Sequence, residues 1–127
     1  MNDDVIHVVM DETAMVAAGT GNLKASRLIH FAASDPTWLL YAPTCALVEA
    51  DRVRPGTAEH LASLPDLTVL DLDLPAALAL GRESTWGQAH ARHAAEPTPE
   101  MPSGAFIATV DTARWTGQKI RLIDLSP

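Results

Sequence analysis

The clearest pattern in the chain is the apolar run from Val5 to Met10, which only His7 interrupts. Because its apolar positions do not alternate with polar ones, the run predicts a strand buried on both faces, as in a parallel sheet. Asp11 and Glu12 follow at once, and ligands bind in open α/β sheets beyond the carboxyl ends of the strands. Asp11 is equally well placed to cap a helix that begins directly after it. The local pattern leaves both roles open.

Further apolar segments predict strands, and segments with helical periodicity separate them. This alternation is typical of a parallel sheet that helices cover on both faces. Asn22 precedes one helical segment and is its expected N-cap. Three prolines between residues 96 and 104 predict a loop there. The sequence therefore predicts a single domain over residues 1–127, with a three-layer α/β/α fold and a mainly parallel five-stranded sheet. The expected strands cover residues 5–10, 37–41, 67–71, 105–110 and 119–125, and the expected helices cover residues 13–18, 23–33, 57–64, 76–80 and 88–95, with one more that starts near Pro43.

The chain has 127 residues, a formal net charge of −7 and one cysteine, Cys45. The negative charge argues against a protein that coats DNA, which needs a basic surface, but it is compatible with a nuclease that has an acidic metal site. A lone cysteine excludes an intramolecular disulfide and a cysteine-based zinc site. Residues 1–4 lack the basic region of a signal peptide, and no apolar run is long enough to cross a membrane. We therefore expect a cytoplasmic protein without a membrane segment.

Acidic residues follow two of the predicted strands directly: Asp11 after the first and Asp111 after the fourth. Parallel strands bring such residues to the same edge of a sheet. Glu49 lies in the helix after the second strand and is expected close to that edge. Three converging carboxylates repel one another unless they are protonated or bridged by a cation. Mg²⁺ or Mn²⁺ suits such an all-oxygen site. The pattern therefore predicts a divalent metal site.

Three segments, in this order, resemble motifs of the PIN-domain family, and within it the small toxin ribonucleases of toxin–antitoxin pairs (VapC-like). The segments are Met10-Asp11-Glu12-Thr13-Ala14, Leu47-Val48-Glu49-Ala50-Asp51-Arg52 and Ala108-Thr109-Val110-Asp111-Thr112. The resemblance extends over essentially the whole chain and implies a PIN-like fold. It also implies a toxin–antitoxin type endoribonuclease that depends on Mg²⁺ or Mn²⁺, in which the metal activates a water for attack on a phosphodiester.

The same resemblance assigns roles to individual residues. Asp11, Glu49 and Asp111 are the expected catalytic residues and metal ligands, with Arg52 pairing with Glu49 on one helix face. The expected substrate-binding residues are Thr13, Arg52 and Thr109. The implied partners are RNA, a cognate antitoxin-like protein and a second copy of the chain. For such a homodimer, the helix over residues 23–33 is the candidate surface.

The chain departs from this family pattern at Gln88, which aligns with a further aspartate of the family at the start of the helix before the fourth strand. An amide oxygen can coordinate a hard cation, so Gln88 remains a candidate metal ligand, but it brings no charge. The site would hold three negative charges instead of four. The departure implies a nuclease that is weakly active or degenerate. The proline-rich loop over residues 96–104 lies close to this segment in the sequence.

Two other functions stay open. The first is a non-catalytic PIN-like module that acts by binding a protein partner, which the neutral Gln88 and the negative net charge favour. The second is a phosphatase-like or receiver-like α/β domain. That class needs a lysine after the last strand, facing the acids, whereas Lys119 begins the predicted edge strand. This position argues against it.

Several other residues have the chemistry of a site. His90 and His93 share a helix face, but no partner completes a transition-metal site, so we expect them to pack or to lie near the helix end. Trp38, in a strand, is expected in the core. Trp86 and Trp115 lie in predicted loops near the acidic edge, where base stacking and a structural role are equally plausible. Cys45 is expected to be a small buried residue.

Overall fold

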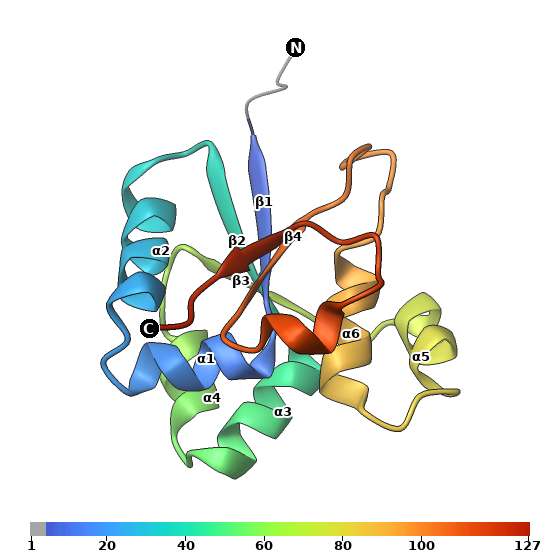
Figure 1. Ribbon diagram of the computed structural model, residues 1–127, viewed down its shortest axis with the longest axis horizontal. Helices are drawn as coiled ribbons and strands as arrows, with labels where there is room; N and C mark the ends of the chain where they lie inside the picture. The colour runs from blue at the N-terminus through green and yellow to red at the C-terminus, as the bar shows by residue number, and fades with distance from the viewer. Residues whose placement is uncertain (1–4) are drawn as a thin grey trace.

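A five-stranded sheet forms the centre of the computed structural model, which describes residues 5–127 (Figure 1). The strand order is β3-β2-β1-β4-β5, and all four pairings are parallel. The strands are β1 (Ile6–Met10), β2 (Trp38–Pro43), β3 (Leu67–Leu70), β4 (Phe106–Thr109) and β5 (Leu122–Asp124). These strands confirm the predicted parallel sheet. The last strand is shorter than predicted: residues 119–121, expected at its start, lie outside it. The expectation about residues 1–4 falls outside the described residues.

Helices follow the strands in the predicted alternation. They are α1 (Glu12–Gly19), α2 (Leu23–Ser34), α3 (Thr44–Val53), α4 (Thr57–Ala62), α5 (Leu74–Leu80), α6 (Trp86–Ala94) and the short 3₁₀ helix η1 (Thr112–Trp115). Two of them begin two residues earlier than predicted. In α5 the reason is Asp73, which caps the helix by accepting a hydrogen bond from the Ala76 N–H at 2.9 Å, so that Pro75 falls in the first turn, where it is tolerated.

The central strand β1 is buried on both faces, as its run of apolar residues without regular alternation predicts. Val8 and Met10 pack into one core cluster with residues of α1, α2, α3 and α4. Val9, whose side chain points the other way, packs into a second cluster with residues of α6 and η1. Each of these three side chains is at most 1% exposed. Helices therefore cover both faces of the sheet, and the three-layer α/β/α architecture is confirmed (Figure 1).

Local capping works as the sequence predicts at Asn22. Its side-chain oxygen accepts the N–H of Ala25 at 2.9 Å and so starts α2. The amide group also donates to the carbonyl oxygen of Leu125 at 2.8 Å, which fastens the end of the chain to this helix.

Within the described residues, the structure contains no helix with the length and apolar character required to cross a membrane.

The expectations for the histidines and tryptophans have different outcomes. His90 packs in the core at 2% exposure, and its Nδ1 accepts the backbone N–H of Cys45 at 3.2 Å. Burial lowers the pKa of His90, with a further decrease from the neighbouring His93, so the imidazole is neutral at pH 7. Trp38 is half-buried and stacks on Phe31. Cys45, expected to be buried, is only partly so.

Candidate functional site

The carboxyl ends of β1 and β4 lie side by side at the centre of the sheet. Met10 of β1 pairs with Ala108 of β4, and the N–H of Asp11 donates to the Ala108 carbonyl oxygen at 3.2 Å. The chain runs from β1 towards β3 on one side and returns to β4 on the other, so this is the position where the strand order reverses. Ligand sites of open α/β sheets lie at such positions. The structure thus brings Asp11 and Asp111 to one edge, as predicted.

Asp11 is fully buried and makes hydrogen bonds with both carboxylate oxygens. Oδ1 accepts the N–H of Ala14 at 3.0 Å, which caps α1, and the hydroxyl of Thr13 at 2.6 Å. Oδ2 accepts the indole N–H of Trp115 at 3.2 Å. The two roles that the local pattern left open therefore coexist. Asp11 is a helix cap and also stands at the acidic edge of the sheet.

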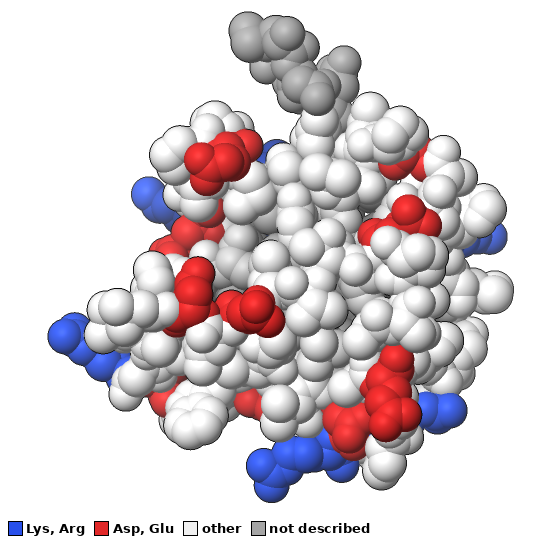
Figure 2. Space-filling view, turned by 180° about the vertical axis from the view of Figure 1, so that it is seen from behind, with Lys and Arg blue, Asp and Glu red and all other residues white. Residues whose placement is uncertain are grey.

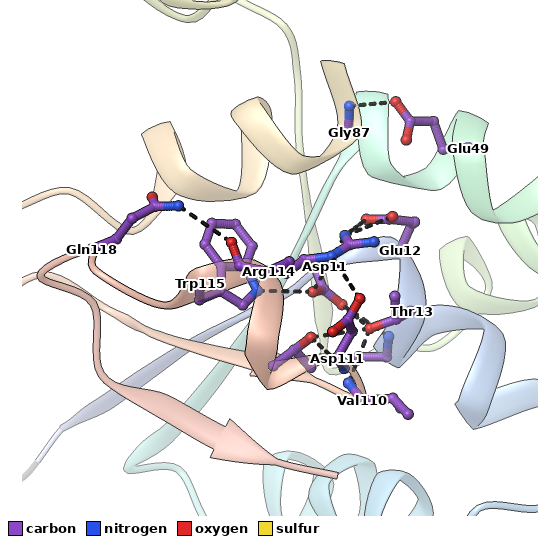
Figure 3. Close-up of polar contacts among 12 residues, drawn as sticks. Asp11, Glu12, Thr13, Glu49, Gly87, Val110, Asp111, Arg114, Trp115 and Gln118 are labelled. Carbon is purple, nitrogen blue, oxygen red and sulfur yellow. Dashed lines mark hydrogen bonds and ion pairs between the residues drawn. The ribbon is translucent and has the colours of Figure 1, made fainter. Parts of the chain in front are cut away.

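Arg114 of η1 lies among three carboxylates, which we call the acidic cluster: Asp11, Glu12 and Asp111. Its Nη1 donates to both oxygens of Glu12, at 2.7 and 2.8 Å. Nη1 also lies 3.8 Å from Oδ2 of Asp11, and Nε lies 3.7 Å from Oδ2 of Asp111. Figure 3 shows the three carboxylates gathered around this one guanidinium group. Arg114 therefore supplies the positive charge that three converging acids require.

The environment keeps Arg114 ionised. Burial by itself works against the charge, since its side chain is only 20% exposed. The hydrogen bond and the charge of Glu12, together with the charges of Asp11 and Asp111, outweigh that cost and raise the pKa of Arg114. An arginine is protonated in any case, so the consequence is geometric. The guanidinium is a permanent cation held at the edge where the sequence predicts a metal.

Thr13 and Thr109 bind each other and the backbone, and Thr13 also donates to Asp11, while their expected contact with a substrate stays a prediction. Their hydroxyl oxygens are 3.1 Å apart, and the Thr13 oxygen also accepts the N–H of Val110 at 3.0 Å. Thr109 is fully buried, and its oxygen accepts the N–H of Asp111 at 3.0 Å. These contacts fasten the start of α1 to the end of β4 and so hold the two strand ends in register.

Glu49 does not join the acidic cluster. One of its carboxylate oxygens accepts the N–H of Gly87 at 2.6 Å, at the start of α6 (Figure 3). Thr85, the N-cap residue of α6, makes no side-chain capping bond, so Glu49 supplies from α3 the negative charge that a helix start favours. The prediction that Glu49 pairs with Arg52 is wrong. Arg52 is exposed, and within the described residues no ion pair joins the two side chains.

Gly87→Ala tests this cap. A Cβ at position 87 would lie 2.7–2.9 Å from the Glu49 carboxylate and would push it off the helix start. The lost charge-assisted bond costs about 1.5–3 kcal/mol, which about 1 kcal/mol of better helix propensity offsets in part. We therefore expect urea denaturation to show a net loss of about 0.5–2 kcal/mol. The control is Gly81→Ala at the end of α5, where the nearest atom is 3.4 Å away and no loss is expected. Equal losses would contradict the cap.

Gln88 is the third residue of α6, because the helix begins at Trp86 instead of at the predicted position. Gln88 is half-buried. Within residues 5–127 no hydrogen bond joins it to Asp11, Glu49 or Asp111, so its role as a metal ligand stays a prediction.

The acidic cluster does not fit a divalent cation while Arg114 is in place. All the oxygens of Asp11 and Glu12 are already held by protein donors, and Glu49 is engaged at α6. In the described part of the chain, no three Asp, Glu, His or Cys side chains are grouped so that they could hold a metal ion. A metal that used Asp11 and Asp111 would first have to displace the guanidinium.

Sequence reasoning missed two residues of the site, Arg114 and Gly87, and left the role of Trp115 open. Arg114 stands three positions after Asp111, a spacing at which opposite charges meet on one helical turn, and that signal could have found it. Trp115 was assigned to a loop, but it is 2% exposed and donates to Asp11. Its burial has no local signal. Gly87 stands out only once Glu49 is seen against it.

Comparison with known proteins adds no relative: no protein-family model matches the chain, and no curated protein matches its sequence. The argument for function therefore depends on the motifs and on the geometry of the site.

Proposed function

We propose that this protein is a PIN-like domain of the metal-dependent endoribonuclease lineage, of the toxin–antitoxin type, in which Arg114 balances the acidic cluster in place of a divalent cation. In this resting arrangement it cleaves RNA weakly or not at all. The observation that carries the proposal is the position of the guanidinium, within 4 Å of Asp11, Glu12 and Asp111. The proposal places the protein in the reducing cytoplasm, in line with its single free cysteine.

Three features support the nuclease lineage. The motifs that contain Asp11, Glu49 and Asp111 fall on the expected elements of an all-parallel sheet. Asp11 and Asp111 meet at the edge where the strand order reverses. Thr13 and Thr109 hold this edge together through partly buried hydrogen bonds. Arg114 accounts for the loss of activity. Its positive charge already compensates the repulsion between the acids, so they gain less from binding a metal ion.

Metal titration of the natural protein and of Arg114→Ala tests the proposal. We expect Mg²⁺ and Mn²⁺ to leave the melting temperature of the natural protein unchanged, with RNA cleavage at background. Arg114→Ala leaves three carboxylates without their counter-charge, so it should melt lower without metal and regain stability with it. At a metal concentration of a hundred times Kd, the gain is about 2.7 kcal/mol. Differential scanning calorimetry measures both effects.

Arg82→Ala is the matched control, because Arg82 is exposed and makes no ion pair within the described residues. It should behave as the natural protein does. If Arg114→Ala does not fold, Arg114→Gln retains an amide donor beside Glu12 and serves in its place. Strong stabilisation of the natural protein by Mg²⁺, with brisk metal-dependent cleavage, would contradict the proposal.

A second candidate is a non-catalytic module that binds an antitoxin-like protein. Leu74 and Leu78, one turn apart on α5, are 70% and 69% exposed, and Trp86 at the start of α6 is 62% exposed. Exposed apolar side chains of this size mark protein interaction sites when they are contiguous. If Arg114→Ala gains neither metal binding nor cleavage, this binding function is the better account.

The expected homodimer also stays a prediction. On the expected helix, α2, Leu23 and Phe31 are 72% and 48% exposed.

A further inference from the structure

A cavity of about 370 Å³ is lined by residues of the proline-rich loop after α6 and of the segment that leads into β5. Three cations line it, Arg92, Lys119 and Arg121, against one carboxylate, that of Glu96. The whole chain has only nine Lys and Arg residues and a net charge of −7. A third of its positive side chains are therefore gathered around one cavity, although the protein as a whole is acidic.

Figure 2 shows the back of the molecule, where acidic side chains are scattered over the face and Lys and Arg side chains lie near its rim. A cavity whose charged lining residues are three cations and one carboxylate favours an anionic ligand, because the local field attracts it although the protein as a whole is negatively charged.

Arg121 is held in position before any ligand arrives. Its Nη2 donates to the carbonyl oxygens of Ser103 and Gly104, both at 3.2 Å, and its guanidinium carbon lies 4.2 Å from the centre of the Phe106 ring. Within the described residues, its Nε and Nη1 make no hydrogen bond. A fixed guanidinium with free N–H groups suits the oxygens of a phosphate, and little rotamer entropy remains to be lost.

The other two cations complete the positive lining of the cavity. Arg92 is anchored through one Nη2 contact with Glu83. Lys119 is exposed, and no hydrogen bond or ion pair holds its amino group in residues 5–127. An unengaged ammonium beside two ordered guanidinium groups can close on a phosphate as a mobile point charge.

Gln118 adds a requirement for a hydrogen-bond donor. It lines the same cavity, and its Oε1 is buried with no partner among the described residues. Its Nε2 faces the carbonyl oxygen of Arg114 at 3.5 Å. This contact orients the amide and leaves Oε1 without a hydrogen-bond donor. Buried acceptors are nearly always paired. Because Oε1 has almost no exposed surface, a bound molecule supplies the missing N–H or O–H when the Gln118 side chain turns its amide towards the cavity. Inorganic phosphate alone fills neither this role nor the volume.

We propose that this cavity binds a nucleotide with a terminal phosphate, either a free nucleoside monophosphate or the same group at the end of an RNA chain. The phosphate contacts Arg92, Lys119 and Arg121, and a donor of the base or ribose contacts Oε1 of Gln118. The side chains of the acidic cluster do not line this cavity. The inference therefore goes beyond the proposed function and does not depend on it.

Isothermal titration calorimetry on the full chain tests the site with AMP, GMP, adenosine, inorganic phosphate and a 5′-phosphorylated RNA dinucleotide. We expect AMP or GMP to bind at least about tenfold more tightly than adenosine, because the phosphate contacts are charge-assisted. Lys119→Ala should weaken nucleotide binding about tenfold. Gln118→Leu should weaken it about threefold to tenfold and leave any binding of inorganic phosphate unchanged.

Arg82→Ala is the control for a general charge effect, because Arg82 is an exposed arginine outside the cavity. It should leave the nucleotide affinity unchanged. A dinucleotide that binds more tightly than AMP and GMP, and that remains sensitive to Lys119→Ala, supports the site and identifies RNA ends as its source. The inference is overturned if no nucleotide binds, if inorganic phosphate binds as tightly as AMP and GMP, or if Lys119→Ala changes the affinity no more than Arg82→Ala does.

Discussion

Asp11→Ala is expected to lower the free energy of unfolding by about 3–5 kcal/mol, because the substitution breaks a buried, hydrogen-bonded charge pair and leaves its partners without an acceptor. The Asp11 carboxylate is fully buried and accepts bonds from Ala14, Thr13 and Trp115. Its loss leaves Arg114 facing two acids instead of three. Small domains are stable by about 5–15 kcal/mol, so the variant would be close to unfolding. Urea denaturation followed by circular dichroism measures the shift of the midpoint.

Asp111→Ala is the matched control. Asp111 also pairs with Arg114, at 3.7 Å, but its side chain is 51% exposed. Exposed ion pairs contribute about 0–1 kcal/mol, so this variant should lose less than about 1 kcal/mol. The intermediate variant Asp11→Asn keeps the capping oxygen for Ala14 but turns an amide N–H towards the indole N–H of Trp115. Its loss should fall between the other two. Equal losses for Asp11→Ala and Asp111→Ala would show that Asp11 does not hold this edge together.

Metal-dependent RNA cleavage is expected to appear when Gln88→Asp is combined with Arg114→Ala. Removal of the guanidinium leaves the acidic cluster of Asp11, Glu12 and Asp111 without its cation, and an aspartate at position 88 supplies a fourth carboxylate in addition to these three. The first turn of α6, where Gln88 lies, tolerates negative charge because of its free backbone N–H groups. Affinity for a hard cation rises with ligand charge, so the double variant should bind Mn²⁺ at least about tenfold more tightly than Arg114→Ala alone.

Calorimetric titration and a labelled RNA substrate measure binding and cleavage in the same set of variants. The control is Gln88→Ala in the Arg114→Ala background, which removes the amide oxygen without adding charge and should gain nothing. Without metal, the double variant should be less stable than Arg114→Ala, because the extra charge increases repulsion. If the natural protein cleaves RNA as fast as the double variant, Gln88 is not the cause of weak activity and Arg114 does not block the site.

Much of the fold could be predicted because its signals are local. The apolar run of β1, which does not alternate with polar residues, indicated burial on both faces, and Val8 and Val9 do pack into opposite clusters. Asn22 and Asp11 cap the helices that follow them, because an N-cap oxygen needs only the backbone N–H three residues ahead. Alternation of strand and helix then leaves few topologies, since parallel crossovers are right-handed and cover both faces of the sheet.

The two helix starts that differ most from the prediction have different reasons, one local and one not. The capping by Asp73 allows Pro75 inside α5. The start of α6 at Trp86 depends instead on a carboxylate from another helix, because Glu49 serves its first turn from 38 residues away in the sequence. The first case could have been found from the sequence by weighing Asp73 as a cap. The second could not, since the capping group lies outside any local window.

The sequence by itself determined the parallel α/β architecture, the caps of α1 and α2, and the meeting of Asp11 and Asp111 at one edge. Only the tertiary structure decided what those acids do there. Arg114 reaches Glu12 across 102 residues, and Trp115 reaches Asp11 across 104. The physical reason is that strand and cap signals come from the backbone geometry of neighbouring residues, whereas the partner of a buried charge is whichever group the packed chain places within a few ångströms of it.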